Sequence, residues 1–460
     1  MMPPARRKYF LAVLLVILAF NRVDTQALGL VFQSIKSELH LSDTQLGVLS
    51  GIAFALFYSV MGIPIARWAD RGNRVAIIAI TTALWSVAVM LCATAKTFLQ
   101  LLLIRIGVAT GEAGCIPPAH SLIADYFTRA ERPRAVAIYM LGAYLSVIIG
   151  YFFAGWLNEI YGWRVMFVLL GAPGVLLAIV AACTLYEPRT WHAVEDTAHR
   201  DQRRTVPTAE ARTPRESSAP PLSLAQNSSS SAPDPEEAAP TLQTVFRTLG
   251  SNKTFRHLLL SFCVVFFFGA GFEQWQPAFF LRSYGLKTGE VGTWFAVIYG
   301  TGGFLGTYLG GVWASRYAAN NERLQLQAIA MTYSALAVVS FAIYLSPALY
   351  LSFALMGLAA LGPAMASGPL FATIQTLVPE RMRAMSIALI YLFANLIGTG
   401  LGPLLVGALS DALHGVAGEE SLRYALLAMC PGYLWGAWLL WRASQTVTLD
   451  LAHADSKLLN

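Results

Sequence analysis

A five-residue motif that occurs twice constrains the fold of this chain more than any other feature. Residues 131–135 read Glu-Arg-Pro-Arg-Ala and residues 380–384 read Glu-Arg-Met-Arg-Ala, and each copy lies between two long apolar runs. The repeat unit is far longer than the roughly 20–50 residues of a solenoid repeat. It has room for about six membrane-spanning helices. The sequence therefore predicts a fold of two related helical halves.

Composition places the apolar runs in a membrane. Of the 460 residues, 56% are hydrophobic and 13% are charged, whereas a soluble domain carries about 25% charged residues. We therefore predict an all-α integral membrane protein. The net charge of +6 does not require a nucleic-acid partner, because the basic residues lie mostly in one set of loops. The five cysteines lie in apolar runs without paired spacing, which predicts packing residues and no disulfide or metal site.

Twelve apolar stretches have about the 20 residues that a membrane-spanning helix needs. Basic residues 6–8 precede the first, as in a signal peptide, but polar residues 21–24 interrupt it and no clear cleavage site follows. We therefore predict an uncleaved first span. The predicted spans are approximately 9–32, 46–66, 75–95, 98–124, 135–157 and 165–186, and then 257–281, 291–314, 325–345, 348–376, 385–409 and 423–442.

The spans divide the chain into two six-helix bundles, predicted at residues 1–186 and 254–444. Residues 187–253 contain too few apolar residues to form a core, so we expect a mostly disordered linker. Residues 445–460 are predicted to be a tail. Basic residues follow spans two, four, eight and ten, which places the linker, the tail and both termini in the cytoplasm. We expect a multi-pass protein of a bacterial inner membrane.

Four charged residues fall inside predicted spans of the first half. They are Arg22 and Asp24 in the first span and Arg105 and Glu112 in the fourth. A charge at the bilayer centre costs roughly 2.5–3.5 kcal/mol on the insertion scale, so each needs a partner or water. Arg105 and Glu112 lie about 10 Å apart along a helix and nearly on one face. Both are expected to face one cavity, with a substrate, a water chain or Asp24 between them.

Asp24 and Glu112 are the predicted protonation sites, and Arg105 is expected to tune Glu112 or to meet an anionic substrate. In general, burial raises the pKa of a carboxyl group and a nearby arginine lowers it. A carboxyl group balanced between these effects takes up and releases a proton as the cavity opens to each side. The alternative is a permanent buried ion pair that only fixes helix packing.

The second half has an acid of its own. Glu273 corresponds to Asp24 when the two copies of the motif are aligned, and Trp275 lies close by. Glu273 is either a second cavity carboxylate or an interfacial residue near the outer mouth. The further candidates for substrate binding are Asn21, Arg22, His120, Tyr144 and Tyr391. For the histidine and the two tyrosines, core packing is the alternative.

The loop after the second span offers charges for a cytoplasmic gate. Asp70 is expected to meet the positive N-terminal end of another helix, such as the eleventh span. Arg71 and Arg74 are expected to pair with Asp125 at the end of the fourth span, and Arg134 belongs to the same set. Such contacts hold the cytoplasmic side closed and break on opening. The alternative is positive-inside anchoring, which explains the arginines but not the acid.

These residues resemble the major facilitator superfamily, and within it the Spinster-like branch. Asp70, Arg71 and Arg74 match the superfamily's loop between helices two and three, where Ala66 and Asn73 replace glycines. The branch is matched by Arg105 with Gly111-Glu112-Ala113, by Gly162-Trp163-Arg164 and by Trp275-Gln276-Pro277. The chain departs from the branch in the first span, because Thr25 follows Asp24 and the arginine is Arg22.

The resemblance implies a proton-coupled secondary transporter whose two halves rock around a central cavity. It implies a lysophospholipid or sphingoid-type amphiphile as substrate, with protons and membrane lipids as the other partners and the chain as a monomer. A mostly apolar cavity with a side opening would favour a lipid, and several inward arginines would favour a small anion.

Two alternatives stay open. A nearby branch of the family carries small organic anions with protons, and a non-transporting sensor can be built on the same scaffold. The sequence contains no P-loop, no metal-ligand cluster and no nucleophile elbow. We therefore expect no enzyme, no cofactor and no ATP-driven transport.

Overall fold

The computed structural model describes residues 4–128, 130–188, 249–319, 321–378 and 382–458. Most of the predicted linker, 187–253, lies outside these residues. The last helix, α18 (Pro431–Leu458), continues through most of the segment predicted as a tail. All regular secondary structure in the described residues is helical.

The described helices form two sets. The first set is α1 (Pro4–Asn21), α2 (Val23–Leu39), α3 (Asp43–Ser50), α4 (Ile52–Arg71), α5 (Arg74–Leu91), α6 (Phe98–Glu112), α7 (Ile116–Tyr126) and α8 (Arg132–Thr184). The second set is α11 (Lys253–Tyr284), α12 (Thr288–Tyr317), α13 (Glu322–Leu345), α14 (Leu349–Leu377), α15 (Arg383–Phe393), the π-helix η4 (Ala394–Thr399), α16 (Gly400–Ala417), α17 (Ser421–Met429) and α18.

Nine helical stretches of the described residues are long and apolar enough to cross a membrane. The two longest, Arg134–Thr184 and Met385–Leu451, have 51 and 67 residues, which is more than one crossing needs. Each contains a glycine with a positive φ where the chain turns, Gly162 at 79° and Gly418 at 55°, a backbone conformation that glycine adopts most easily. The nine stretches confirm a multi-pass all-α membrane protein. The count of twelve spans stays a prediction.

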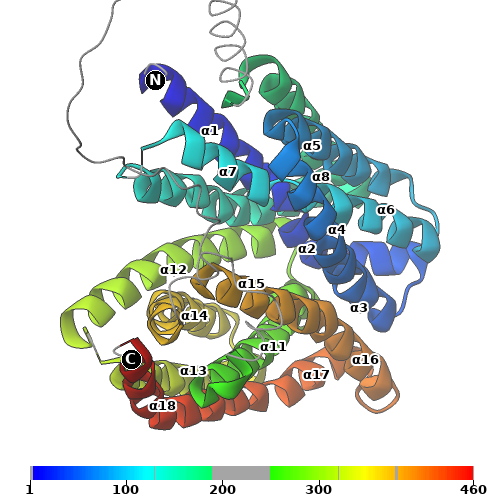
Figure 1. Ribbon diagram of the computed structural model, residues 1–460. Helices are drawn as coiled ribbons and strands as arrows, with labels where there is room; N and C mark the ends of the chain where they lie inside the picture. The colour runs from blue at the N-terminus through cyan, green and yellow to red at the C-terminus, as the bar shows by residue number, and fades with distance from the viewer. Residues whose placement is uncertain (1–3, 129, 189–248, 320, 379–381, 459–460) are drawn as a thin grey trace, which may run out of the picture.

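The two halves lie side by side. In Figure 1 the blue-to-cyan first half lies above the green-to-red second half, and α3 and α16 meet at one end of the bundle. The halves also pack through α8 against α12 and through α2 against α11. We refer to the end where α3 begins as the Asp43 end, and to the end where α11 begins as the Lys253 end.

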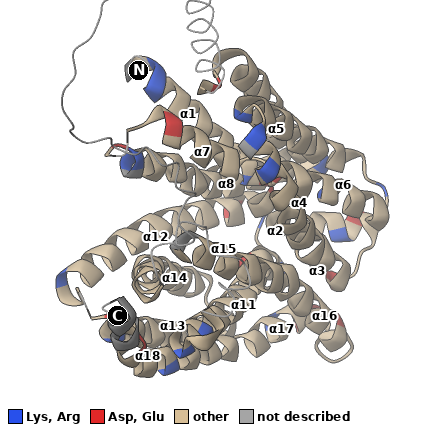
Figure 2. Ribbon diagram, in the orientation of Figure 1, with Lys and Arg blue, Asp and Glu red and all other residues tan. Residues whose placement is uncertain are grey.

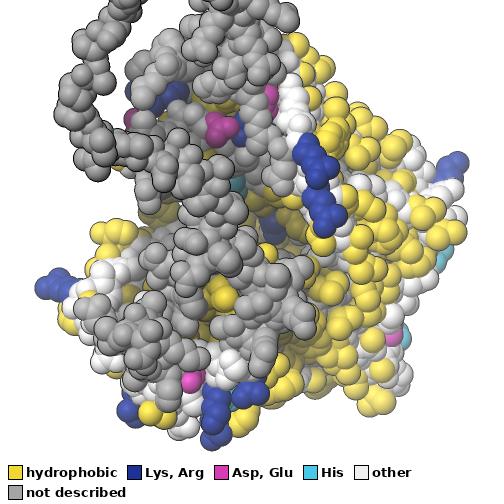
Figure 3. Space-filling view, in the orientation of Figure 1, with side chains coloured by type: hydrophobic (Ala, Val, Ile, Leu, Met, Phe, Trp, Pro, Cys, Tyr) yellow, Lys and Arg dark blue, Asp and Glu magenta, His cyan; other side chains and the backbone are white. Residues whose placement is uncertain are grey.

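Apolar side chains cover the flanks of the bundle, as lipid requires. Figure 3 shows a nearly continuous hydrophobic surface along one flank, and Figure 2 shows most charged segments close to helix ends. Because the lipid interior offers no hydrogen bonds, the polar backbone is satisfied within helices.

Small residues allow the halves to approach closely. A Cβ atom on Gly407 of α16 would lie 2.3 Å from the backbone oxygen of Asp43, and one on Gly155 of α8 would lie 2.5 Å from that of Thr288. Glycine at these positions lets the helix backbones touch, which gives van der Waals contact that larger residues would prevent.

We predict that Gly407→Ala lowers the apparent melting temperature of the purified protein. The added methyl group overpacks the contact between α3 and α16, at a cost of about 1–3 kcal/mol. Tryptophan fluorescence during heating in detergent measures the effect. Gly415→Ala, on the same helix but with no atom within 4 Å of the added Cβ, is the matched control. Equal melting temperatures for the two variants would show that this contact tolerates a larger residue.

Candidate functional site

A cavity of about 510 Å³ lies between the two halves. Few residues of the first half line it, and most of its wall comes from α11 to α15, η4 and α18 of the second half. This wall is largely apolar and aromatic. Its rings include Phe262, Phe266, Tyr333, Phe371, Tyr391 and Tyr433.

The charged groups among the described residues that line the cavity lie where α2 faces α11. Arg22, at the break between α1 and α2, lines the cavity and forms no ion pair with any residue that the structure describes. Gln26 Nε2 donates to Glu273 Oε1 at 3.2 Å, across the boundary between the halves. The Tyr299 hydroxyl donates to Gln276 Oε1 in the same region. The cavity therefore has a charged, polar part and a large aromatic part.

Asp24, Arg105 and Glu112 form a buried cluster in the first half, here named the Asp24 cluster. Each residue is 1% exposed. Arg105 Nη1 lies 2.5 Å from Asp24 Oδ2, and Glu112 lies close enough to Asp24 for the two carboxyl groups to interact electrostatically. Asp24 thus lies between the other two, which is one of the three arrangements that the sequence allowed. Within the described residues, Asp24 Oδ1, Arg105 Nε and Glu112 Oε1 have no hydrogen-bond partner.

Arg22 connects the Asp24 cluster to the cavity. No side chain of the cluster lines the cavity, whereas Arg22, two residues before Asp24, does. The charge of Arg22 also acts on Glu112. On another side of the cluster, Arg105 Cζ lies 5.5 Å from the centre of the Phe54 ring. Arg22 is therefore the charged group that both regions share.

Three other predicted substrate-binding residues lie on α11 and α15. Glu273 and Tyr391 line the cavity. Trp275 is fully buried instead. Its ring centre lies 4.8 Å from that of Phe32, and its Nε1 donates to the backbone oxygen of Pro403 at 2.8 Å. In this conformation Trp275 holds helices together and does not face the cavity.

The remaining three substrate candidates also lie away from the cavity. Tyr144 forms a hydrogen bond of 2.8 Å with Thr307, between α8 and α12. His120 packs edge-on against Tyr139, with ring centres 5.6 Å apart. Asn21 is buried, and its Nδ2 has no hydrogen-bond partner in the described part of the chain. The structure therefore places these side chains among packed helices.

Arg74 is the centre of an ion-pair group at the Lys253 end. Its Nη2 lies 2.7 Å from Asp125 Oδ2 and 2.5 Å from Glu187 Oε1. The expected pair with Asp125 is thus present, but it joins elements of one half. Glu187, at the start of the predicted linker, was missed because nothing in its local sequence shows that it folds back onto α5.

The other predicted gate residues form no such group in this conformation. Arg71 and Arg134 are exposed, and neither forms an ion pair with a described residue. The side chain of Asp70 lies outside the described part of the structure. The contact expected between Asp70 and the eleventh span stays a prediction.

The first copy of the repeated motif is anchored through its acid. The backbone nitrogen and the hydroxyl of Thr128 donate to Glu131 Oε2 at 3.2 and 3.0 Å, and Arg7 Nη1 lies 2.8 Å from the same oxygen. The hydrogen bonds from Thr128, together with the charge of Arg7, hold the pKa of Glu131 below its ordinary value, because they stabilise the carboxylate.

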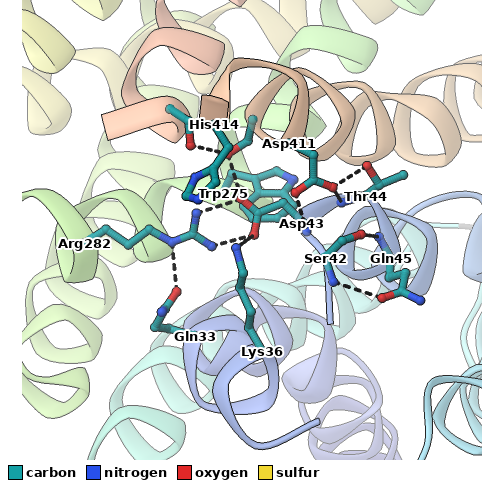
Figure 4. Close-up of polar contacts among 12 residues, drawn as sticks. Gln33, Lys36, Ser42, Asp43, Thr44, Gln45, Trp275, Arg282, Asp411 and His414 are labelled. Carbon is teal, nitrogen blue, oxygen red and sulfur yellow. Dashed lines mark hydrogen bonds and ion pairs between the residues drawn. The ribbon is translucent and has the colours of Figure 1, made fainter. Parts of the chain in front are cut away.

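An ion-pair network joins the halves at the Asp43 end (Figure 4). The Asp43 carboxylate accepts from Lys36 Nζ at 2.7 Å and from both terminal nitrogens of Arg282 at 2.7 Å. The hydroxyl of Ser410 on α16 donates to it at 2.7 Å. Both Asp43 and Arg282 are buried, so these contacts seal this end of the interface.

Asp411 adds a helix cap across the same interface. Its carboxylate accepts from the backbone nitrogens of Asp43 and Thr44 at 3.0 and 2.7 Å and from the Thr44 hydroxyl at 2.6 Å. A carboxylate stabilises a helix N-terminus. The sequence signals this helix start through Ser42 and Gln45, which form a capping box. It carries no signal for the partners from the other half.

Comparison with known proteins places the fold in a family. Residues 14–403 match the family model described as the Major Facilitator Superfamily. An MFS-type efflux pump of Mycolicibacterium smegmatis is 29% identical over 456 residues, covering 97% of this chain and 95% of that protein. A probable L-galactonate transporter of Escherichia coli is 25% identical over 420 residues, covering 90% of this chain and 85% of that protein.

A solved structure gives the same assignment. The crystal structure of a bacterial homologue of the human lysosomal transporter Spinster, inward-facing and unoccupied, has a TM-score of 0.79 to this structure. It is 29% identical and covers 98% of this chain and 99% of that one. These likenesses confirm the resemblance found in the sequence. The chain therefore belongs to the major facilitator superfamily and is a multi-pass membrane transporter, not an enzyme.

Proposed function

We propose that this protein is a proton-coupled transporter that moves an amphipathic, lipid-like substrate by alternating access. The observation that carries the proposal is the cavity between the halves, with Arg22 and Glu273 in its polar part and aromatic rings along the rest. A molecule with a charged head and an apolar body suits both parts, because each part offers the contacts that one portion of the molecule requires.

The balance of charge in the cavity favours a lipid-like substrate over a small anion. Arg22 is the one Lys or Arg among the described residues that line it. A lysophospholipid or sphingoid base would set its head against Arg22 and Glu273 and its chain along the rings of Phe262 and Phe266. The likeness to the solved Spinster homologue supports this assignment.

Charge balance in the Asp24 cluster supports proton coupling. The cluster buries two carboxyl groups with one guanidinium, so two carboxylates leave one negative charge in excess. Such an excess in a buried site is costly. Either the charge of Arg22 or a proton on Glu112 offsets it. If Arg22 turns towards the phosphate of a lysophospholipid, a proton on Glu112 restores the balance, so binding of this substrate and binding of the proton favour each other.

The Asp43 network supports one state of an alternating-access cycle. The basic loops assign the Lys253 end to the cytoplasm, so in this proposal the Asp43 network closes the outer side. That assignment agrees with the inward-facing conformation of the similar Spinster homologue. Transport would then require the ion pairs of Asp43 to break and re-form in each cycle.

A small organic anion is the second candidate substrate. Relatives include the probable L-galactonate transporter and a cis,cis-muconate transport protein, and Arg22 offers a partner for one carboxylate. The phenylalanine rings of the wall offer no hydrogen bonds to such a polar molecule, which is why we place this candidate second.

We expect substrate-dependent acidification of liposomes that contain the purified protein and an interior pH dye. Lysophosphatidylcholine, sphingosine and L-galactonate are added one at a time, with protein-free liposomes as the control for leakage. Acidification with a lysolipid or sphingosine supports the proposal. Acidification with L-galactonate alone supports the second candidate. Binding of a compound without any flux would instead indicate a sensor.

We predict that Glu112→Gln abolishes proton-driven uptake but retains exchange of labelled for unlabelled substrate at equal pH. Glutamine keeps the shape of the side chain and cannot carry the proton. Both fluxes are measured in the same proteoliposomes. Glu322→Gln, at the start of α13 and outside the cavity lining, should keep both. If Glu112→Gln lost the fold or lost exchange as well, the cluster would be a structural ion pair.

We predict that Arg282→Gln opens the Asp43 end more often. It leaves Asp43 with Lys36 as its remaining cation, and breaking a buried pair costs about 3–5 kcal/mol. The readout is the labelling rate of Ser410→Cys, a position with 0% exposure, by a membrane-impermeant maleimide. Arg423→Gln, which loses an ion pair to Glu420 within one half, is the control. Equal labelling rates in the two variants would remove the gating role of Arg282.

A further inference from the structure

A second apolar groove lies on the lipid-facing surface of the second half, between α13 and α18. Its volume is about 440 Å³, and its lining includes Met331, Ser334, Leu434, Trp438 and Trp441. Met331 is 60% exposed and Trp438 is 56% exposed, although both lie in stretches that cross the membrane. The surroundings of this α13–α18 groove are therefore lipid.

The groove is separate from the transport cavity. Tyr333 and Tyr433, which neighbour groove residues in the sequence, line the cavity from the opposite faces of α13 and α18. The two helices thus form a wall with the cavity on one side and the groove on the other. A molecule in the groove would have no contact with the transported substrate.

A positive charge lies at one end of the groove. Arg442 directly follows Trp441, is exposed, and has its Cζ atom 5.9 Å from the centre of the Trp438 ring. Arg442 lies within α18 but at the end of its apolar run, and an arginine beside tryptophans at such a place is typical of the membrane–water interface. Arg442 forms no ion pair with any residue that the structure describes.

The start of α11, which packs against α18, adds further positive charge. Lys253 and Arg256 are exposed there, and the charges of Arg256 and Arg442 both reach His257. Asp450, an acid of the same region, accepts from the backbone nitrogen of Thr254 at 2.8 Å. Figure 2 shows basic segments gathered on this side of the second half.

We infer that the α13–α18 groove binds an anionic phospholipid from the leaflet at the Lys253 end. Its acyl chain would lie along Met331 and Trp438, and its phosphate would lie between Arg442 and Arg256. Basic pockets between transmembrane helices recognise anionic headgroups in this way. A soluble anion would not use the apolar groove, and an uncharged lipid would leave the arginines without a partner. The positive charge at the end of the groove therefore favours an anionic lipid over an uncharged one.

Quenching of tryptophan fluorescence by brominated lipids tests the inference, because quenching requires close contact. The full chain is reconstituted in phosphatidylcholine with increasing shares of brominated phosphatidylglycerol or brominated phosphatidylcholine. The difference between the wild type and Trp438→Phe isolates the signal at the groove. We expect half-quenching at a share of brominated phosphatidylglycerol about fivefold lower than that of brominated phosphatidylcholine, from the attraction of about one basic residue.

Substitutions of Arg442 test whether this residue causes the preference for phosphatidylglycerol over phosphatidylcholine. Arg442→Gln should remove most of the preference. Arg442→Lys should retain the preference, because the positive charge remains. The matched control is Arg316→Gln, which removes an exposed arginine beside Tyr317 at the end of α12 and should leave the preference unchanged. Equal quenching by the two lipids in the wild type would overturn the inference. So would a preference that survives Arg442→Gln or falls equally with Arg316→Gln, since it would then reflect the general charge of this membrane face.

Discussion

The cost of leaving a charge without a partner in the membrane is the constraint on which the other features depend. Asp24 and Arg105 form a buried ion pair in the first half, and Glu112 is the third member of the Asp24 cluster. Losing Asp24 or Arg105 would leave the charge of the other without a partner in a medium that solvates charge poorly. Both spans that supply the cluster are broken beside it, at Arg22 between α1 and α2 and just after Glu112 between α6 and α7. Charge and backbone irregularity therefore occur together.

The second half shows a similar relation between irregular backbone and the cavity. The π-helix η4 contains Asn395 and Thr399, and both line the cavity. Non-α backbone within a membrane is tolerated where protein or a cavity, and not lipid, surrounds it, and π-helical turns are frequent at functional sites. The break at Arg22 in the first half obeys the same rule. The two halves thus place their least regular segments around the same space.

The sequence predicted features that each span carries within itself. Apolar length and the repeated motif indicated the two-halved helical fold, and the rarity of buried charge singled out Arg22, Asp24, Arg105 and Glu112. The sequence could not predict contacts that arise only when distant segments pack. Asp43, Arg282 and Asp411 lie at the ends of apolar runs, where charges are ordinary, so nothing marked them as one network. The direction of an aromatic side chain is equally hidden, because Trp275 has polar neighbours on both sides in the sequence and is buried, whereas Tyr391 lies in an apolar run and lines the cavity.

The unequal shares of the two halves in the cavity wall have an evolutionary consequence. The first half contributes Arg22 and the nearby Asp24 cluster, and the second half contributes most of the surface that a cargo would touch. Most of the recognition surface is therefore encoded in a different part of the chain from the proposed energy coupling. Substitutions among the rings of the second half can change the cargo while the buried charges of the first half stay intact. Transporters with this division of roles can therefore change their substrate while they keep the same residues for proton coupling.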